Sequence, residues 1–595
     1  MDGADTMTTV DPITVEVIRH RLLSGAREMA TNLMRTAYNT VVYEIRDFGI
    51  GIYDRRGRMV AEAPGLTILA RANDFALARV IDFLGYEKIH PGDAILLNYP
   101  YWSSAHTLDV ACVTPIFVGD ELVGFTAVRI HWLDLMQKDA GYCLDTTDMY
   151  QEGIFFPCTK IYRRGELNED VVNILRFNSR MPERVLGDMH AQISACRIGE
   201  KRTAEIVERF GLDVYEAAID QIMDHGERMA RLRLAALPRG TWSAEDYLDG
   251  DGIDDRLVKM KATVTITADE MVIDWTGSDP ATKGPINLPF GETLALSSLV
   301  FKALTTPESP ANEGNFRPLR VIAPEGSLLH AMPPAPTFTL WTGLLAGEVI
   351  LKALAPAMPD LLPACSGGDV CSMMGLGLNP RTGRAWLEAT NEAVGFGGHA
   401  QGDGENGIMH MTEPGCRNNP VEVLETKAPL FIEHYGLRPD SGGPGFHRGG
   451  LGISRAYRFL ADSTAAMIVY KTKTRPWGIG QGQSGENCHV ILNPDTDRPE
   501  ITGGFYRPMA AGEVLVNNSG GGGGWGDPFG RDPARVLEDV RLGYVTPQGS
   551  RRDYGVEIDA EHWVVDEAET ARLRNGGRPP ELGPVGAGVP TRGRS

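Results

Sequence analysis

The chain has 595 residues, of which 42% are hydrophobic and 23% are charged, and its formal net charge is -20. A chain of this length is too long for one hydrophobic core, so two or three globular domains are expected. The acidic balance argues against a nucleic-acid-binding protein, because a polyanion would be repelled.

The chain opens with the acidic stretch MDGADTMTT, which has no apolar signal core. No apolar run in the chain approaches the roughly 18 residues that a membrane span needs. Eight cysteines are scattered without a Cys-x-x-Cys pair, which favours reduced, buried thiols over disulfides or a four-cysteine zinc site. We therefore expect a cytoplasmic protein that binds neither nucleic acid nor membranes.

Helical patterns dominate the first 240 residues. Asp11 can cap a helix and Pro12 suits its first turn, and apolar residues at helical spacing follow as far as Tyr38. Further helical patterns cover residues 75–84, 168–211 and 213–237, and strand patterns cover 48–53, 59–60 and 94–98.

Two His-x-x-Asp motifs flank a hairpin pattern in this part of the chain, His106-Thr-Leu-Asp109 and His131-Trp-Leu-Asp134. Two apolar runs of strand length lie between the motifs and are joined by a turn at Gly119. Such a hairpin returns both histidines to one end of the ladder. Two imidazoles and a carboxylate suit a divalent metal such as Zn, Mn or Fe, and the alternative is a set of polar strand ends bonded to backbone.

The pattern changes after residue 238, where short alternating runs at 259–266 and 270–275 predict strands and residues 293–304 predict a helix. Glycine becomes dense beyond residue 390. These patterns predict an α+β protein, with a helix-rich N-terminal part that carries the metal-bearing hairpin and a β-rich, Gly-rich C-terminal part. The expected parts are a metal-site domain at 1–240, a mixed α/β middle domain at 241–390, a Gly-rich β domain at 391–574 and a disordered tail at 575–595.

Four glycine-rich clusters raise the question of phosphate binding, at 395–404, 442–445, 449–452 and 520–526. None has the Walker form, and none stands as a dinucleotide fingerprint between a strand and a helix. Glycine outside such a context permits left-handed turns and close backbone approach. If the protein uses ATP, we expect the nucleotide site to lie on a partner subunit.

Several sequence blocks together resemble the hydantoinase B/oxoprolinase family. They are EIRDF at 44–48, DRRG at 54–57, NYPY at 98–101, HTLD at 106–109, WTG at 275–277, GPIN at 284–287, NPVEVLE at 419–425, DSGGPG at 440–445, RGGLG at 448–452, GGGGGWGDP at 520–528 and DVRLG at 539–543. The family contains B-type subunits of N-methylhydantoinases and ATP-dependent lactamases, the C-terminal half of 5-oxoprolinase, and metal-bearing subunits of acetone and acetophenone carboxylases.

The resemblance implies a metal site, because the family pattern of His-x-x-Asp with a second histidine matches His106, Asp109 and His131. The flanks differ from the common family pattern. The chain has Ser-Ser-Ala before His106 where Gly-Gly-Thr is common, and Trp132 follows the second histidine where another histidine is common. The resemblance therefore implies a conserved ligand set in a bulkier, more apolar setting, in which Tyr99, Trp132 and Met136 suit an apolar substrate or simple packing.

The resemblance implies the metal-bearing catalytic subunit of a heteromeric, ATP-dependent amidohydrolase. A hydantoinase A-type ATPase subunit would phosphorylate a cyclic amide such as a hydantoin, a lactam or 5-oxoproline, and this chain would open the ring. Asp134 would orient an imidazole or act as general base, with a surface carboxylate as the alternative. An ATP-dependent ketone carboxylase and a non-catalytic scaffold subunit are the other two hypotheses.

Three polar runs are assigned no role. They are residues 176–180, 188–192 and 471–475, which are expected to be solvated helix faces or loops, and the alternative for the first two is that they line the pocket or a partner interface.

Overall fold

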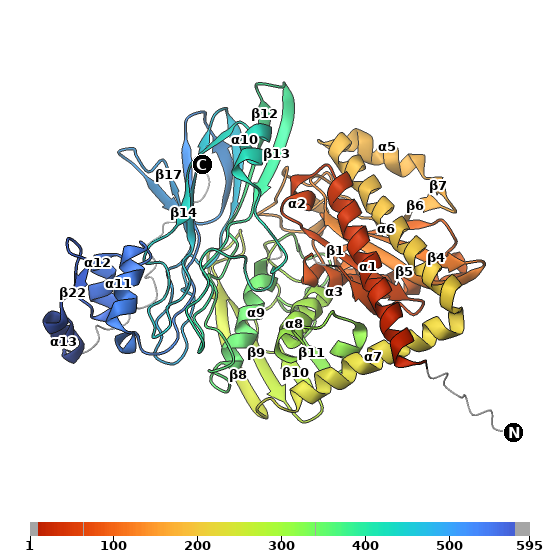
Figure 1. Cartoon of the computed structure of the whole chain (residues 1–595). Helices are drawn as coiled ribbons and strands as arrows, with labels where there is room; N and C mark the ends of the chain where they lie inside the picture. Colours follow the sequence, from red (N-terminus) through yellow and green to blue (C-terminus); the bar gives the residue numbers. More distant parts are fainter. Residues whose placement is uncertain (1–9, 64, 340, 577–595) are drawn as a thin grey trace. The chain divides into compact units, whose positions relative to one another are not determined.

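The computed structural model describes residues 10–63, 65–339 and 341–576. The chain folds as two compact units (Figure 1), one built from Met1–Thr241 with Thr263–Gly343 and the other from Trp242–Ala262 with Leu344–Ser595. Helices and several sheets are present, so the α+β class is confirmed. The three-part division with boundaries near 240 and 390 stays a prediction. Most of the expected tail, residues 577–595, lies outside the described residues.

The first unit surrounds a seven-stranded sheet of order β2-β1-β5-β4-β3-β6-β7. Its helices are α1 (Pro12–Thr36), α2 (Thr40–Tyr43), α3 (Thr67–Leu84), α4 (Pro100–Ser103), α5 (Glu169–Asn178), α6 (Pro182–Phe210), α7 (Leu212–Leu234) and α8 (Phe290–Thr305). Its strands are β1 (Phe48–Asp54), β2 (Met59–Glu62), β3 (Ala94–Leu97), β4 (Asp109–Val118), β5 (Glu121–His131), β6 (Thr159–Arg163), β7 (Glu166–Leu167), β10 (Met271–Asp274) and β11 (Leu319–Ile322), while β8 (Gly240–Leu248) and β9 (Val258–Ile266) hold residues of both units.

The predicted first helix and hairpin of this unit are confirmed, whereas the helical pattern at 168–211 is divided into α5 and α6, and α3 begins before the expected residue 75. Asp11 caps α1 by accepting hydrogen bonds from the backbone N–H groups of Ile13 and Thr14. Strands β4 and β5 form the predicted hairpin, and Gly119 turns the chain between them with a positive φ of 59°.

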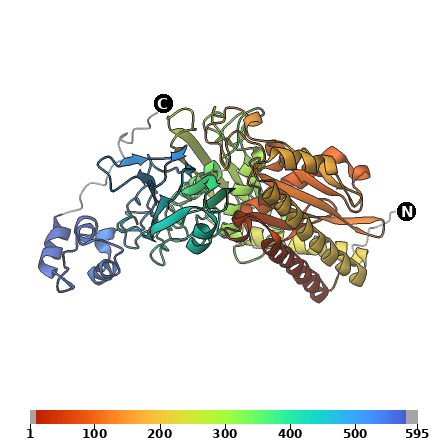
Figure 2. The same ribbon diagram turned by 90° about the horizontal axis from the view of Figure 1, so that it is seen from above.

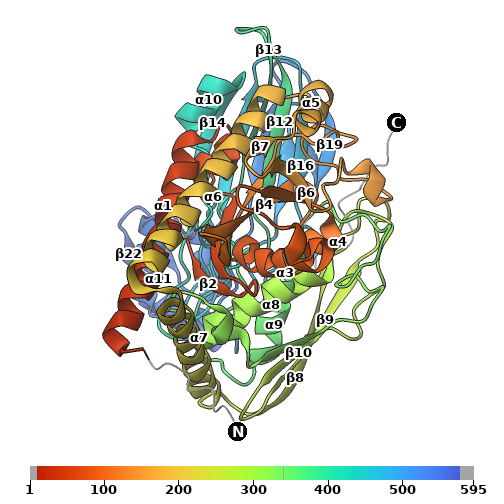
Figure 3. The same cartoon turned by 90° about the vertical axis from the view of Figure 1, so that its right-hand side faces the viewer.

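Helices cover both faces of the sheet. Gly25 of α1 approaches Ile52 of β1, whereas Gly49 of the same strand lies against Leu69 of α3. Because side chains alternate along a strand, α1 lies on one face of the sheet and α3 on the other. Helix α6 packs beside α1 (Figures 2 and 3), and α3 packs against α8.

The second unit carries two antiparallel sheets of order β13-β12-β16-β19 and β14-β15-β20-β17-β18. Their strands are β12 (Ser372–Asn379), β13 (Arg384–Thr390), β14 (Leu430–Leu437), β15 (Ile453–Phe459), β16 (Ser463–Ile468), β17 (His489–Leu492), β18 (Glu500–Thr502), β19 (Phe505–Met509) and β20 (Val514–Asn518). The remaining elements are α10 (Val421–Lys427), α11 (Pro533–Arg541), α12 (Pro547–Tyr554), β21 (Ile558–Asp559), β22 (Val564–Val565) and α13 (Glu567–Asn575), while α9 (Trp341–Leu354) holds residues of both units.

The glycine clusters of this unit pack against one another. Successive residues of the 520–524 run bond to different neighbours, with Gly522 N donating to Gly450 O and Gly523 N donating to Cys365 O. A Cβ on Gly522 would lie 2.0 Å from Phe396 O. The predicted close backbone approach is therefore confirmed, and it explains why no larger residue stands in the run.

The segment 242–262 is tied to the rest of the second unit by the run 471–475. Lys471 is 1% exposed and forms an ion pair of 2.7 Å with Asp246, and Asp249 accepts hydrogen bonds from the backbone and hydroxyl of Thr472. The expectation that this run is solvated is wrong for Lys471, because its acidic partners lie more than 200 residues away in the sequence.

All eight cysteines are buried and free, as predicted. In the described part of the chain, no helix combines the length and the apolar character required to cross a membrane.

Candidate metal centre

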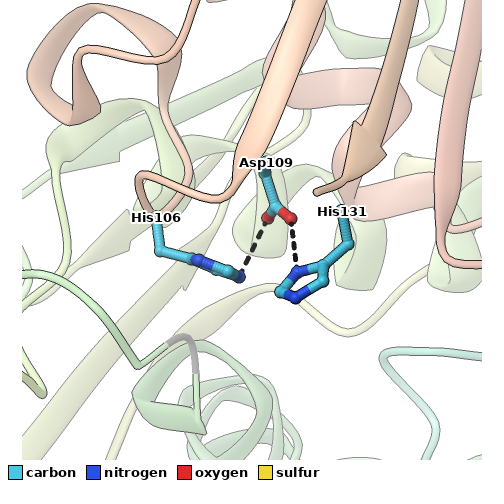
Figure 4. Close-up of side chains that lie close together, drawn as sticks. All are labelled: His106, Asp109 and His131. Atoms are coloured by element: carbon cyan, nitrogen blue, oxygen red, sulfur yellow. Dashed lines mark hydrogen bonds and ion pairs between the residues drawn. The ribbon is translucent and has the colours of Figure 1, made fainter. Parts of the chain in front are cut away.

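The three predicted ligand residues come from one end of the β4–β5 hairpin. His106 lies in the turn between α4 and β4, Asp109 is the first residue of β4, and His131 is the last residue of β5. Asp109 and His131 face each other as paired residues of the two strands. Figure 4 shows the three side chains converging on a common point.

The donor atoms of these residues lie within 4.8 Å of one another. Each oxygen of the Asp109 carboxylate faces one imidazole, with Oδ2 3.4 Å from His106 Nε2 and Oδ1 3.2 Å from His131 Nδ1. All three residues are at most 2% exposed. The sequence therefore placed the cluster correctly, and it is the only such group of His, Cys, Asp and Glu among the described residues.

Burial and mutual contacts shift the pKa of all three residues of the cluster. Burial lowers the pKa of His106 to about 4, so its imidazole is neutral at pH 7 and one ring nitrogen keeps its lone pair. Burial alone would raise the pKa of Asp109, but the two histidines outweigh burial and lower it. Burial would likewise lower the pKa of His131, yet the hydrogen bond that its ring makes with Asp109 raises it.

The donor set fits a divalent transition metal. Two imidazole nitrogens and a carboxylate are the ligands of many catalytic Zn, Mn and Fe sites, which keep further positions open for water and substrate. Nδ1 of His106 is buried without a hydrogen-bond partner, and the carboxylate alone does not satisfy both rings. The residues present therefore fit the ion that the sequence implies.

Arg129 holds the turn that carries His106. Its guanidinium is fully buried and donates to Ser103 O (2.6 Å), Ser103 Oγ (2.7 Å) and Asp109 O (3.3 Å). Arg129 stands two residues before His131 on β5, so it lies on the same face of the sheet. It thereby ties the His106 turn to the strand that carries the second imidazole.

Helix α6 contributes two buried polar residues, of which Gln192 bonds to the hairpin and Asp188 to the segment before α2. Gln192 Nε2 donates to the carbonyls of Val110 and Val128 at 2.6 Å, and Asp188 accepts from the backbone N–H of Asn39. The expectation that run 188–192 is a solvated face is therefore wrong for Asp188 and Gln192, which are fully buried.

Asp134 lies outside the cluster of donor atoms. It is fully buried, so the surface alternative is wrong. Its carboxylate accepts from Ser179 Oγ at 2.9 Å, from the backbone N–H of Arg180, and from the Arg180 guanidinium at 2.7 Å. These donors anchor the loop after β5 to the start of α6.

Asp47 is a site residue that the motif analysis did not single out. Burial and the nearby charge of Asp109 raise its pKa to about 7, and His131 acts in the opposite direction. Because Phe48 of β1 pairs with Ile130 of β5, the preceding Asp47 falls beside His131. Only the strand register reveals that this carboxylate lies near the centre, and it is not a member of the group of donor atoms.

The rings around the histidines also differ from the expected ones. Tyr142 stacks on His131 with centroids 5.7 Å apart and planes at 12°, and Phe338 lies 5.5 Å from His106. Trp132 instead donates to Gln192, and Tyr99 packs on Trp102. Long loops supply the observed rings, so no local pattern marked them.

Comparison with known proteins assigns this architecture to a family. The model of the hydantoinase B/oxoprolinase family matches residues 11–528. The chain belongs to the hydantoinase B/oxoprolinase family. That membership confirms the resemblance found in the sequence blocks.

Two relatives in the family match over nearly their whole length. A protein of Pseudomonas sp. (strain NS671), provisionally named as the B-type subunit of a D-/L-hydantoinase, is 33% identical over 95% of this chain and 98% of its own length. The beta chain of the caprolactamase of Pseudomonas jessenii is 30% identical over 95% and 99%. The crystal structure of ATP-dependent caprolactamase from that organism superposes with a TM-score of 0.89, covering 96% of this chain and 100% of the other.

A protein of much lower sequence identity shares this fold. A nucleotide-free structure of acetone carboxylase superposes with a TM-score of 0.88 over 95% of this chain and 83% of the other, at 19% identity. At that sequence identity the match shows only that the fold is shared.

Proposed function

We propose that this chain is the metal-bearing catalytic subunit of a heteromeric, ATP-dependent amidohydrolase that opens a cyclic amide. The buried cluster of His106, Asp109 and His131 carries the proposal, because it supplies a complete donor set for a divalent ion. The hydantoinase and caprolactamase relatives point to cyclic amides as the substrate class.

Each residue of the cluster has a defined role in this proposal. His106, Asp109 and His131 are the ligands, and Asp47 stands beside them as a further carboxylate. The bound ion would lower the pKa of a water molecule and polarise the carbonyl that it attacks. Arg129 keeps the ligand turn in place during the reaction.

In this proposal Asp134 positions the loop after β5 and is not the general base. Its carboxylate already accepts from Ser179 and twice from Arg180, so its lone pairs are directed at these donors. Asp47, which the strand register places beside His131, is the carboxylate that takes up the proton in this proposal.

A partner subunit completes the reaction. The relatives from Pseudomonas sp. and from P. jessenii are each named as one subunit of an enzyme. The amide of a small ring is a poor electrophile, and phosphorylation of its oxygen by an A-type ATPase subunit would make the ring carbon reactive.

The proposal is tested by recovering the complex of the full chain from its native source. We expect an A-type ATPase subunit in the complex, a stoichiometric divalent metal, and ATP-dependent opening of hydantoin, 5-oxoproline or caprolactam. Fixation of bicarbonate onto a ketone without any ring opening would instead establish the carboxylase hypothesis.

Substitution of a ligand residue distinguishes a catalytic subunit from a non-catalytic scaffold subunit. His106→Ala is expected to lose the metal and to lower turnover at least about a thousandfold while the fold is kept, and His190→Ala on the exposed face of α6 is the matched control. Full activity of His106→Ala in the complex would exclude the metal mechanism.

A further inference from the structure

Helix α6 lies close against the hairpin that carries the metal centre. A Cβ on Gly199 would stand 2.6 Å from the side chain of Thr126 on β5, and Thr126 Oγ1 donates to Cys196 O at 3.3 Å. Gln192 precedes Cys196 by one helical turn and Gly199 by two, so all three share one face of the helix. The glycine permits the close approach, and the Gln192 amide therefore reaches both strands of the hairpin.

The Gln192 amide connects the residues that follow two of the three ligands. Its Nε2 donates to Val110 O at 2.6 Å, and its Oε1 accepts from Trp132 Nε1 at 3.1 Å. Val110 follows Asp109 at the start of β4. Trp132 follows His131, the last residue of β5. One side chain of α6 therefore links the two strand ends independently of the backbone ladder.

A second connection from α6 reaches the backbone of His131. Asp188 lies one helical turn before Gln192 and accepts from the backbone N–H of Asn39 at 3.2 Å. The Asn39 side chain donates from Nδ2 to His131 O at 3.2 Å, and its Oδ1 caps α2 by accepting from Val41 N at 2.9 Å. Both ends of the Asn39 amide are thus engaged, so the segment before α2 holds His131 O in place.

These connections are important because the ligands stand where the strand ladder ends. Asp109 is the first residue of β4 and pairs with His131, the last residue of β5. Gln192, Trp132 and Asn39 are all 0% exposed, so their hydrogen bonds form in a low dielectric and without competition from solvent. They can therefore maintain the separation of 3.2 Å between Asp109 Oδ1 and His131 Nδ1.

We propose that Gln192, Trp132 and Asn39 are positioning residues that set the geometry of the metal centre through His131. Their hydrogen bonds go to one another and to the backbone beside the ligands, so they act on the ion by fixing where the His131 ring stands relative to Asp109. This inference rests on the metal site of the proposed function, and it adds the residues that determine the affinity of that site.

The test measures the binding of Co²⁺ alone to the full chain after its metal has been removed with a chelator, with neither ATP nor substrate present. The absorption spectrum of bound Co²⁺ depends on its coordination geometry, so it reports a displaced ligand that a stability measurement would not detect. Trp132→Phe keeps an aromatic ring and removes the indole N–H. It is expected to weaken Co²⁺ binding about tenfold and to change the spectrum.

Two further substitutions separate the two connections. Gln192→Met preserves the length of the side chain and removes its hydrogen bonds, and it breaks the same connection as Trp132→Phe. The double variant should therefore bind Co²⁺ nearly as well as Gln192→Met alone. Asn39→Ser retains a capping hydroxyl for α2 but lacks the donor to His131 O, and it is expected to weaken Co²⁺ binding about tenfold.

Trp275→Phe is the matched control. Trp275 is another fully buried tryptophan of the first unit, and its Nε1 donates to Ser297 Oγ of α8 at 3.4 Å. This variant should lose stability as Trp132→Phe does, because each loses a buried hydrogen bond, while its Co²⁺ affinity and spectrum stay those of the wild type. Chemical denaturation of the metal-free proteins measures the stability.

Unchanged Co²⁺ affinity and spectrum in Trp132→Phe and Asn39→Ser would overturn the inference, and so would an equal loss of affinity in Trp275→Phe. Trp132→Phe gives the answer for the Gln192 connection if Gln192→Met does not fold. The two proposals fail separately. Co²⁺ binding that responds to these substitutions in a complex without ring opening would reject the hydrolase alone, whereas ring opening with unresponsive Co²⁺ binding would reject this inference alone.

Discussion

At the scale of single residues, function and stability depend on buried charges that have defined partners. His106 and His131 share the carboxylate of Asp109, and Arg129 and Asp134 hold the loops on either side. Because each of these groups has lost its hydration, removal of one partner leaves the others unsatisfied.

Asp134→Ala is expected to lower the free energy of unfolding by about 2 to 4 kcal/mol, because Ser179 and Arg180 lose their common acceptor. Chemical denaturation measures the loss, and Asp120→Ala in the exposed turn of the hairpin serves as control. If Asp134 acted as the base, turnover would instead fall without a loss of stability.

Glu152 makes the stability of the first unit depend on pH. Burial raises its pKa to about 8 from an ordinary value near 4.5, in spite of the hydrogen bonds from Thr337 and Thr146. The folded state therefore binds a proton that the unfolded state releases between these two values, so the contribution of Glu152 to stability is greatest below about pH 4.5 and is lost as the pH rises to about 8.

Glu152→Gln is expected to remove this part of the pH dependence, since the amide oxygen still accepts hydrogen bonds but does not titrate. At about pH 8 and above the variant should be more stable than the wild type, by an amount on the order of a few kcal/mol. Unfolding at a series of pH values checks this, and parallel curves for the two proteins would contradict it.

At the scale of elements, the glycine run 520–524 leaves no room for larger side chains. Its backbone bonds to several neighbouring segments, and the space where a side chain would stand is filled by their carbonyl groups. Gly522→Ala places a Cβ 2.0 Å from Phe396 O and is expected to cost at least about 3 kcal/mol.

Gly503→Ala is the matched control for that substitution. Its Cβ would lie 3.5 Å from the Thr472 side chain, which is ordinary van der Waals contact. Thermal unfolding of the two variants should therefore show a large loss for Gly522→Ala and little change for Gly503→Ala. Similar midpoints would mean that the glycine run is not closely packed.

At the scale of the whole molecule, the second unit is assembled from two separate stretches of chain. Segment 242–262 joins residues 344–576 through Asp246 and Asp249, which bind Lys471 and Thr472. Asp249→Ala is expected to destabilise this unit by about 1 to 3 kcal/mol, because it leaves two buried donors of Thr472 without a hydrogen-bond acceptor.

Hydrogen exchange locates the effect of Asp249→Ala. Protection should fall in segment 242–262 and around residue 472, whereas Asp255→Ala, an exposed partner of Lys473, should change little. Unchanged protection of segment 242–262 would show that these hydrogen bonds do not hold it.

The sequence by itself determined the elements whose signals are local. Apolar periodicity and caps predicted α1 and the β4–β5 hairpin, and the hairpin length then brought His106, Asp109 and His131 to one end. Family membership followed from blocks that are contiguous in the sequence, and the same blocks led to the expected substrate class.

Only the tertiary structure decided which residues surround that centre. Asp47 reaches it through the register of β1 on β5, and Tyr142 and Phe338 reach it from loops with no periodic pattern. Asp134, Lys471 and Gln192 have polar side chains that a sequence pattern assigns to the surface. Their hydrogen-bond partners lie 45 to 225 residues away in the chain. Burial of these polar side chains is favourable only in a fold that brings those partners to them.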